Sequence, residues 1–295
     1  MADRPRVSLH TTNYNTMPIT RSSLESVLSR LGDLDWELVV TDNLSTDGSY
    51  EVLREFADRG LPIKVLRRRC NRGRGRRLSL EATRGEIALT FDLDTIYNDA
   101  WMRMVAWYLE RRPPYALVAT YAGCYPRAAV DAVGGWRDFQ YWEDVDLWIR
   151  LAAQGLLRAY PMKCGENHKR APAAWEKTHR LYAKMRDTLA LASWVLFSAY
   201  RRGYAALFPF ARGLRRALYY RGVLWAAFLP ARLKRWRFCR KGYDPAVMLR
   251  PEVFVDLDLV PRSELRPVIT DYDTREGVAA AVARGDWGFL PGTYD

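Results

Sequence analysis

The chain has 295 residues, of which 49% are hydrophobic and 13% are aromatic. A chain of this length and composition can bury a large core, which excludes an intrinsically disordered protein. Its four cysteines are scattered without a CxxC pair, which argues against a zinc ribbon or a disulfide framework and suits a reducing compartment. The first residues run directly into an apolar segment, so we expect no signal peptide.

The formal net charge of +12 is unevenly distributed along the chain. The segment from Arg170 to Lys241 contains 17 Lys and Arg residues but only two acidic residues, so its local net charge is +15. The rest of the chain is therefore slightly acidic. The basic character therefore belongs to residues 170–241, and an argument from charge about a binding partner applies to that segment only.

The first 121 residues are predicted to alternate between strands and helices. Leu24, Val27, Leu28 and Leu31 recur at the spacing of one helical face, and turn residues at 45–49 precede a second helix. This order predicts an α/β fold with a mostly parallel sheet covered by helices on both faces. Ligands bind beyond the carboxyl ends of the strands in such sheets, so polar residues there are the first site candidates. Strands are expected at residues 7–12, 36–41, 62–66, 86–91 and 115–121.

From about residue 170 the sequence becomes basic, aromatic and helical. Its longest uncharged runs are Thr188–Tyr200, with 13 residues, and Gly222–Ala231, with ten. A membrane-spanning helix needs about 20 apolar residues, so neither run is expected to cross a bilayer. Aromatic residues alternating with arginines are typical of amphipathic helices that lie on anionic membranes. The alternative is a solvated basic face over an ordinary core.

The chain is accordingly expected to have three parts. A catalytic domain at residues 1–169 is followed by a basic amphipathic helical region at 170–242, which we predict to associate with a membrane. The remaining residues, 243–295, form a C-terminal tail to which the sequence assigns no role.

The most informative motif is Asp92-Leu93-Asp94, which follows the apolar strand Ile87–Phe91. Two carboxylates at positions i and i+2 beyond a strand end can both turn toward one ligand, directly or through a metal. A divalent cation that bridges a diphosphate takes oxygen ligands and needs few protein carboxylates, because the phosphates supply the rest. The motif alone is weak evidence, since surface loops often contain it.

Other motifs accompany this acidic pair in a defined order. Taken together, they resemble the family 2 inverting glycosyltransferases of GT-A fold over about residues 7–170. The resemblance implies a Rossmann-like GT-A domain that binds a nucleotide-sugar donor. The motifs are Thr11-Thr12-Asn13-Tyr14-Asn15, residues 41–49, residues 71–77, Gly134-Gly135-Trp136 and residues 142–150, which include Glu143-Asp144.

The resemblance implies a set of donor-binding residues. Asp42 would accept hydrogen bonds from the base, whereas a turn-capping role fits Asp47 better. Residues 71–77 would lead into a helix beside the diphosphate, where Arg72 or Arg74 would offset phosphate charge by bidentate hydrogen bonds. Asp92 would contact the ribose or the donor sugar. The implied set is Thr11, Asn13, Asp42, Arg72, Arg74 and Asp92.

A metal site is implied by the same resemblance. Asp94 would bind Mn²⁺ or Mg²⁺, and His168, about 20 residues beyond the Glu143-Asp144 pair, would complete the metal shell. A neutral imidazole suits Mn²⁺. The alternative for His168 is an exposed loop histidine, and His10 and His179 are expected to be structural or surface residues.

Glu143 and Asp144 are the implied catalytic residues, at the start of a helix. Asp144 would be the general base that takes the proton from an acceptor hydroxyl as it attacks C1 opposite the diphosphate. A helix N-terminus keeps such a carboxylate ionised. The alternative is that acidic first-turn residues simply cap the helix at 145–154.

The sequence also departs from the family pattern. Thr11-Thr12-Asn13 replaces the usual proline-containing segment, and Asn43-Leu44 stands where a second acid and a glycine are common. The Gln-x-x-Arg-Trp signature of processive polymer synthases is absent after Asp144. We therefore expect one transfer per encounter rather than polymer synthesis.

The expected acceptor lies at a membrane. Similarity to dolichyl-phosphate mannose synthases favours GDP-mannose as donor and a polyprenyl phosphate or glycolipid as acceptor. A phosphate acceptor is already nucleophilic, so Asp144 would then orient it or bind metal. The alternative is a UDP-sugar-dependent enzyme that acts on a glycolipid or glycan hydroxyl. The expected location is cytoplasmic, peripheral on the cytoplasmic face of the cell membrane.

Two other classes of function are alternatives. Residues 170–241 could bind nucleic acid non-specifically, and such binding would be steeply salt-dependent. No nucleic-acid-binding module appears, however, and the aromatic residues recur at helical spacing, which argues against this partner. A catalytically silent scaffold is the second alternative, and the presence of Asp92, Asp94 and Asp144 argues against it.

Overall fold

The computed structural model describes residues 7–168, 174–191 and 214–239, together with 243, 244 and 247. Most of the predicted C-terminal tail at 243–295, and the segment 192–213 of the predicted helical region, lie outside the described residues.

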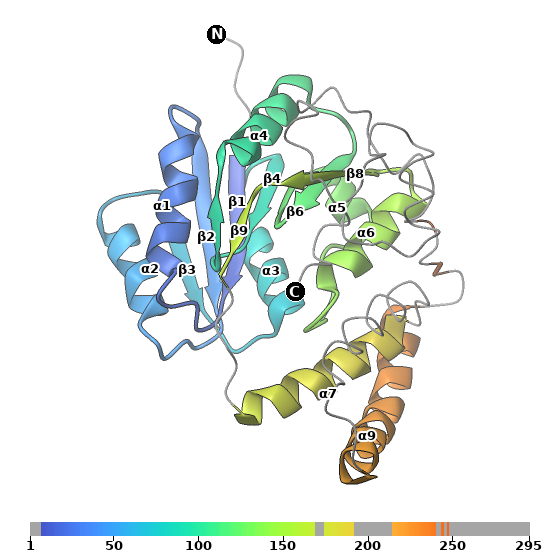
Figure 1. Cartoon of the computed structure of the whole chain (residues 1–295). Helices are drawn as coiled ribbons and strands as arrows, with labels where there is room; N and C mark the ends of the chain where they lie inside the picture. Colours follow the sequence, from blue (N-terminus) through green and yellow to red (C-terminus); the bar gives the residue numbers. More distant parts are fainter. Residues whose placement is uncertain (1–6, 169–173, 192–213, 240–242, 245–246, 248–295) are drawn as a thin grey trace.

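A seven-stranded sheet forms the centre of the α/β domain (Figure 1), in the order β3-β2-β1-β4-β7-β6-β8. Only β7 runs antiparallel to its neighbours, while the remaining adjacent pairs are parallel. The predicted mostly parallel α/β fold is thus confirmed. The strands are β1 (Val7–Asn13), β2 (Trp36–Asp42), β3 (Ile63–Arg67), β4 (Ile87–Phe91), β6 (Ala116–Thr120), β7 (Ala122–Pro126) and β8 (Leu157–Lys163).

Helices cover both faces of this sheet. On one face, α1, α2 and α4 pack in a single core with side chains of β1, β2 and β4, and on the other face α3, α5 and α6 pack in a second core. Strands covered on both faces read as continuous apolar runs, which is why β1 and β4 could be recognised in the sequence. The helices are α1 (Thr20–Leu31), α2 (Ser49–Asp58), α3 (Arg72–Glu81), α4 (Asp99–Arg111), α5 (Arg127–Ala132) and α6 (Glu143–Ala153).

Residues 71–77 are not a segment that leads into a helix but the first turns of the helix itself. Asn71 is the N-cap of α3, and its side-chain oxygen accepts a hydrogen bond from the backbone N–H of Arg74 at 2.9 Å. An asparagine in this position satisfies one of the free donors of the first turn. The helix therefore begins at Arg72, and the arginines at positions 74, 76 and 77 project from its surface at helical spacing.

A second, two-stranded sheet pairs β5 (Thr95–Tyr97) with β9 (Gly165–Asn167). The pairing is antiparallel and matches Thr95 with Asn167. Gly165 is required there, because a Cβ at this position would lie 2.5 Å from the carbonyl oxygen of Ile96. The small sheet therefore brings the residue before β5, Asp94, beside the residue after β9, His168.

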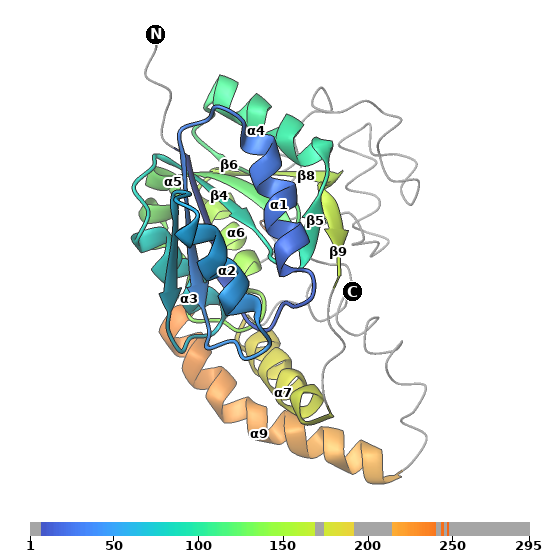
Figure 2. The same cartoon turned by 90° about the vertical axis from the view of Figure 1, so that its left-hand side faces the viewer.

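Two long helices follow the α/β domain and lie side by side (Figures 1 and 2), namely α7 (Ala174–Leu191) and α9 (Leu214–Phe238). Ala227 and Ala231 of α9 are buried, and small residues of this kind let two helices approach closely. The expectation of helices in this region is confirmed for these segments. In the described part of the chain, none of the helices combines the length and the apolar character that a membrane crossing requires.

Candidate active site

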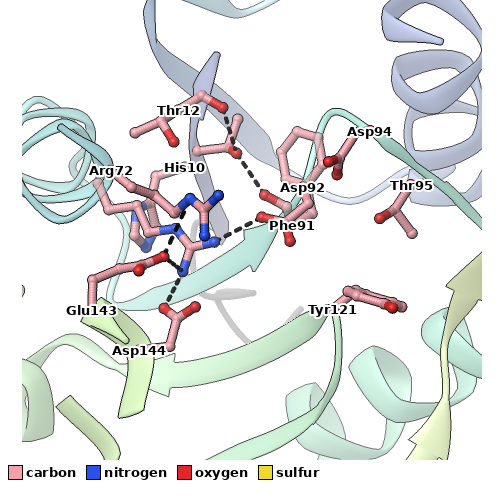
Figure 3. Close-up of polar contacts among 12 residues, drawn as sticks. His10, Thr12, Arg72, Phe91, Asp92, Asp94, Thr95, Tyr121, Glu143 and Asp144 are labelled. Carbon is pink, nitrogen blue, oxygen red and sulfur yellow. Dashed lines mark hydrogen bonds and ion pairs between the residues drawn. The ribbon is translucent and has the colours of Figure 1, made fainter. Parts of the chain in front are cut away.

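The polar residues predicted from the sequence gather at one edge of the sheet. The strands β1, β2 and β4 are parallel, and their carboxyl ends carry Asn13, Asp42 and Asp92. Figure 3 shows Asp92 at the end of β4, with Glu143 and Asp144 at the start of α6 facing it. Asp94 lies on the other side of Asp92 from that pair in this view.

Asn13 and Asp42 form the centre of a buried hydrogen-bond network. The amide nitrogen of Asn13 donates to Asp42 Oδ1 at 2.8 Å and contacts the hydroxyls of Ser45 and Ser49 at 3.1 and 3.0 Å. The second carboxylate oxygen of Asp42 accepts from the backbone N–H of Ser45 at 3.1 Å. The structure thus joins the two predicted nucleotide-pocket residues by a direct bond.

Asp47 and Thr11 make hydrogen bonds that stabilise the fold around the site. Asp47 accepts hydrogen bonds from the backbone N–H of Met17 at 2.8 Å and from both donor groups of Ser49, as a turn-capping residue does. The Thr11 hydroxyl donates to the carbonyl oxygen of Phe91 at 2.6 Å and is buried. This bond ties the end of β1 to the end of β4 and places the following Asp92.

Arg76 occupies the middle of the site. Its side chain is 5% exposed, and one guanidinium nitrogen donates to Asp92 Oδ1 at 2.7 Å. The other terminal nitrogen donates to Asp144 and lies 3.4 Å from Glu143 Oε1. Burial opposes the charge of Arg76, but the three carboxylates outweigh burial and hold the pKa of its guanidinium well above the ordinary value.

Sequence reasoning named Arg72 and Arg74 and missed Arg76. Residues four apart lie on the same face of a helix, so Arg72 and Arg76 both face the carboxylates, while Arg74 points elsewhere and is exposed. Arg72 Nε lies 3.7 Å from Glu143 Oε1, with the side chain 46% exposed. The asparagine cap at position 71 was the signal that would have identified Arg76, because it defines the helix start.

Two glycines let α3 reach this position. A Cβ on Gly73 would lie 2.0 Å from the carbonyl oxygen of Arg137, and a Cβ on Gly75 would lie 2.3 Å from Thr12 Cγ2. The backbone N–H of Gly73 donates to the carbonyl oxygen of Phe139 at 2.8 Å. The first turn of α3 therefore packs directly against the backbone of the segment that precedes α6.

Glu143 and Asp144 begin α6 and differ in their surroundings. Glu143 is 2% exposed, and burial raises the pKa of its carboxyl to about 7, with Arg72 opposing and Asp144 adding to the rise. Asp144 is 25% exposed and accepts a hydrogen bond from the indole N–H of Trp136 at 3.1 Å. Asp144 is thus the member of the pair that solvent can reach.

The Gly134-Gly135-Trp136 motif has a structural reason. Gly134 and Gly135 adopt φ values of 80° and 66°, which side-chain-bearing residues rarely adopt. This turn inserts Trp136 into the core, where its ring meets His10 edge-on at a centroid distance of 4.8 Å. The motif therefore holds the hydrogen-bond donor for Asp144.

Burial lowers the pKa of His10 to about 3, with Arg76 and Arg127 adding to the effect, so His10 is a neutral core residue.

Asp94 and His168 lie next to each other, although 74 positions separate them. The backbone N–H of His168 donates to the carbonyl oxygen of Asp94 at 2.7 Å, and Asn167 donates to Asp94 Oδ1 at 2.8 Å. The His168 side chain is exposed. One carboxylate and one imidazole fit a divalent cation that takes its other ligands from a diphosphate. Within the described residues, no group of three or more His, Cys, Asp or Glu residues is arranged to hold a metal by itself.

Hydrogen bonds of Tyr97 fix the loop that carries Asp92 and Asp94. The backbone N–H of Asp92 donates to the Tyr97 hydroxyl at 2.8 Å, and that hydroxyl donates to the carbonyl oxygen of Tyr121 at 2.6 Å. Tyr121 forms the turn between β6 and β7 with a φ of 62°. The antiparallel strand β7, which the sequence did not reveal, thereby positions the loop after β4.

Comparison with known proteins finds similarity to glycosyltransferases in this part of the chain. Residues 8–143 match the family described as Glycosyl transferase family 2. TuaG of Bacillus subtilis (strain 168), assigned to teichuronic acid biosynthesis as a glycosyltransferase, is 26% identical over 111 residues. The alignment covers 37% of this chain and 44% of TuaG, so the chain spans less than half of that relative. The sheet order and the family match together describe a GT-A-like domain.

Solved structures that are similar to this chain include complexes with different nucleotide sugars. The mannosyltransferase PcManGT from Pyrobaculum calidifontis, in complex with GDP-Man and Mn²⁺, is 17% identical with a TM-score of 0.48, covering 97% of this chain and 88% of that one. TarS residues 1–349 from S. aureus, in complex with UDP-GlcNAc, are 17% identical with a TM-score of 0.49, covering 61% of this chain and 64% of that one.

Proposed function

We propose that the family 2 glycosyl transferase domain of this chain transfers one sugar from a nucleotide-sugar donor to an acceptor, with inversion at the anomeric carbon. One observation carries the proposal. Asp92, at the end of β4, and the pair Glu143-Asp144, at the start of α6, converge on the buried Arg76 at the carboxyl edge of a parallel sheet. Ligands of such sheets bind at that edge.

In the proposed reaction, Asp144 is the general base. The acceptor oxygen forms a bond to C1 of the sugar while the bond from C1 to the diphosphate oxygen breaks, and the acceptor proton passes to the Asp144 carboxylate. The nucleoside diphosphate then leaves from the opposite face. The indole of Trp136 and the guanidinium of Arg76 hold the carboxylate in place through hydrogen bonds. With a phosphate acceptor there is no proton to remove, and Asp144 orients the acceptor instead.

Asp94 and His168 are the residues that would hold a divalent cation, Mn²⁺ or Mg²⁺. When bound, the cation supplies positive charge against the leaving diphosphate. Asn167 orients the Asp94 carboxylate through a hydrogen bond of 2.8 Å. The donor side would be completed by Asn13, Asp42 and Asp92.

The donor we favour is GDP-mannose, and a UDP-sugar is the alternative. Thermal unfolding in the presence of Mn²⁺ and each nucleotide sugar tests both, because a ligand at 100 times its Kd stabilises the folded state by about 2.7 kcal/mol. We expect the nucleotide sugars of one base, guanine or uracil, to raise Tm by several degrees, and only when Mn²⁺ is present. Failure of every GDP- and UDP-linked sugar to do so would contradict the proposed function.

Two variants separate binding from transfer. Asp94→Ala should remove the Mn²⁺-dependent part of the Tm shift. Asp144→Asn should keep that shift but lower transfer to a hydroxyl acceptor by about 10²- to 10⁴-fold, since a general base contributes that much. Asp131→Asn, on an exposed position of α5, is the matched control and should behave as the wild type. Full transfer by Asp144→Asn would remove the base assignment.

The proposed acceptor is a membrane lipid, either a polyprenyl phosphate or a glycolipid. The support comes from α9, whose outer side exposes large apolar residues. With a helical rotation of 100° per residue, these residues fall within an arc of about 140° around the helix axis. The buried Ala227 and Ala231 occupy the opposite side. We propose that this outer side lies on an anionic membrane at the cytoplasmic face, as peripheral amphipathic helices do. The exposed residues are Trp225, Phe228, Leu229, Leu233 and Trp236, with Arg232 among them.

A further inference from the structure

The segment at 137–142, which leads into Glu143 and Asp144, is held on one side by the α/β domain and on the other by α7. On one side, the carbonyl oxygen of Phe139 accepts from the backbone N–H of Gly73 of α3 at 2.8 Å. On the other side, residues 140–142 donate hydrogen bonds to two consecutive side chains of α7. The approach to the catalytic pair therefore depends on a helix that follows the family-matched residues in the chain.

Asp187 makes the central contact. It is fully buried, and its Oδ2 accepts from the backbone N–H groups of Gln140 at 2.8 Å and Tyr141 at 3.0 Å. Its Oδ1 accepts from Lys234 Nζ of α9 at 3.0 Å and from Arg186 Nε at 2.8 Å. One carboxylate thus joins the catalytic segment to both long helices.

Trp142 adds a second link at the next residue. Its indole N–H donates to the Thr188 hydroxyl at 2.9 Å. Trp142 is the N-cap of α6 with a φ of 63°, and its side chain makes no capping hydrogen bond. A bulky residue keeps such a left-handed conformation only where its surroundings enforce it. Contacts with α7 therefore hold the start of α6, from which Glu143 and Asp144 extend.

Lys234 extends the link to α9. Besides its bond to Asp187, its ammonium lies 4.4 Å from the centroid of the Phe139 ring. The same helix meets the segment at Phe238, whose carbonyl oxygen accepts from Arg137. The helix that exposes the apolar outer side is thus in direct contact with the segment that leads to the catalytic pair.

We propose that Asp187 is a positioning residue, which acts through Gln140, Tyr141 and Trp142 to orient Asp144 and couples that orientation to α9 through Lys234. The inference rests on the proposed role of Asp144. It predicts an effect on the transfer step and not on donor binding, because Asn13 and Asp42 belong to the other half of the sheet edge.

The kinetic test compares Asp187→Ala, Asp187→Asn and Lys234→Met with the wild type. Asp187→Ala should lower kcat of transfer about 10-fold or more while the Kd of the nucleotide stays within about twofold, since misplacement of a catalytic group acts on the reaction step. Asp187→Asn should retain more activity, because its amide oxygen can still accept from both backbone N–H groups. Lys234→Met should fall between Asp187→Ala and the wild type. Asp58→Ala, an exposed aspartate paired with Arg54, is the control.

A merely structural role predicts a different pattern. Asp187→Ala would then lower Tm but leave kcat per folded molecule within about twofold of the wild type, and that result would overturn the proposal. An equal loss of nucleotide affinity would overturn it as well. If Asp187→Ala does not fold, Lys234→Met decides the matter, since an unchanged kcat in that variant contradicts the coupling.

Hydrogen exchange provides a readout that needs no turnover. The amides of Gln140 and Tyr141 should exchange faster in Asp187→Ala than in the wild type, while those of β1 and β4 stay protected. Unchanged exchange at Gln140 and Tyr141 would refute the positioning role even in an active enzyme. Absence of transfer by the wild type with every nucleotide sugar would instead contradict the proposed function, so the two failures are distinguishable.

Discussion

Arg76 joins the carboxylate at the end of β4 to the two carboxylates at the start of α6 through one buried guanidinium. A buried ion pair adds little net stability compared with an apolar pair, but removing one partner leaves the others without a counter-charge. Here three carboxylates, from Asp92, Glu143 and Asp144, share the same cation. Arg72 remains as a second cation, but it lies at 3.7 Å from Glu143 and is half exposed.

We therefore predict that Arg76→Met lowers the free energy of unfolding by about 3–5 kcal/mol, the usual cost of breaking a buried ion pair. Urea unfolding measures this change directly. Arg77→Met, the next residue on the exposed face of α3, should change stability by less than about 0.5 kcal/mol. Equal effects of the two substitutions would show that the cluster around Arg76 is not a buried ion-pair network.

Glu143 gives the stability a defined pH dependence. Burial raises the pKa of its carboxyl to about 7, with Arg72 opposing that rise. The protonated form is therefore favoured in the folded state, and this contribution is complete below the unfolded pKa of about 4.5 and lost as the pH rises through about 7. The Glu143→Gln variant does not show this loss, because glutamine does not titrate.

The unfolding free energy of the wild type, relative to Glu143→Gln, should accordingly fall by up to about 3 kcal/mol between pH 4.5 and pH 8. Urea unfolding of both proteins at several pH values in this range measures the difference. A difference that does not vary with pH would mean that Glu143 titrates in the folded protein as it does in the unfolded chain.

At the scale of the elements, the packing of α3 depends on a glycine. Gly73→Ala would place a Cβ 2.0 Å from the backbone oxygen of Arg137, which cannot move without shifting the segment before α6. We expect a loss of about 1–3 kcal/mol or more in unfolding free energy, as for other overpacked positions. Calorimetric unfolding measures it.

Gly222→Ala in α9 is the matched control. A Cβ there meets no atom within 4 Å, so alanine should stabilise the helix by about 0.5–1 kcal/mol through its higher helix propensity. If both substitutions stabilise the protein, the contact between α3 and the segment before α6 is looser than the structure indicates.

Several elements were recognisable in the sequence and others were not. The helix α1 was predicted because Leu24, Val27 and Leu31 repeat on one face, and all three are buried. The strand β7 was missed because its short sequence contains small residues and ends in Pro126, so it has no extended apolar pattern. The start of α3 was missed because an arginine- and glycine-rich segment lacks apolar periodicity, and only Asn71 indicated the helix.

At the scale of the whole molecule, the α/β domain and the pair α7–α9 differ in their surfaces. Five of the large apolar residues exposed in the described part of the chain belong to α9. Trp225 and Trp236 are 75% and 81% exposed. An apolar helix face of this kind in a strongly basic segment is what binding to an anionic bilayer requires.

We predict that the protein sediments with vesicles of anionic lipid at low salt, and that Trp225→Ser together with Trp236→Ser weakens this binding about 10-fold or more. Leu44→Ser, an exposed apolar position far from α9 in sequence, is the control and should bind as the wild type. Binding by the wild type that is abolished by salt but insensitive to the tryptophans would indicate charge attraction alone.

Local chemistry was sufficient to predict the strands β1, β2 and β4 with the polar residues at their carboxyl ends, and the resemblance to a known family placed Glu143 and Asp144 at the start of a helix. Periodicity and turn residues act between near neighbours, so a sequence displays them directly. Only the tertiary structure decided which charges meet. Arg76 reaches Asp92, 16 residues away, and Asp144, 68 residues away, and Asp187 reaches Gln140 across 47 residues. These contacts depend on the order of the strands and on where α7 and α9 pack, which no local pattern in the chain specifies.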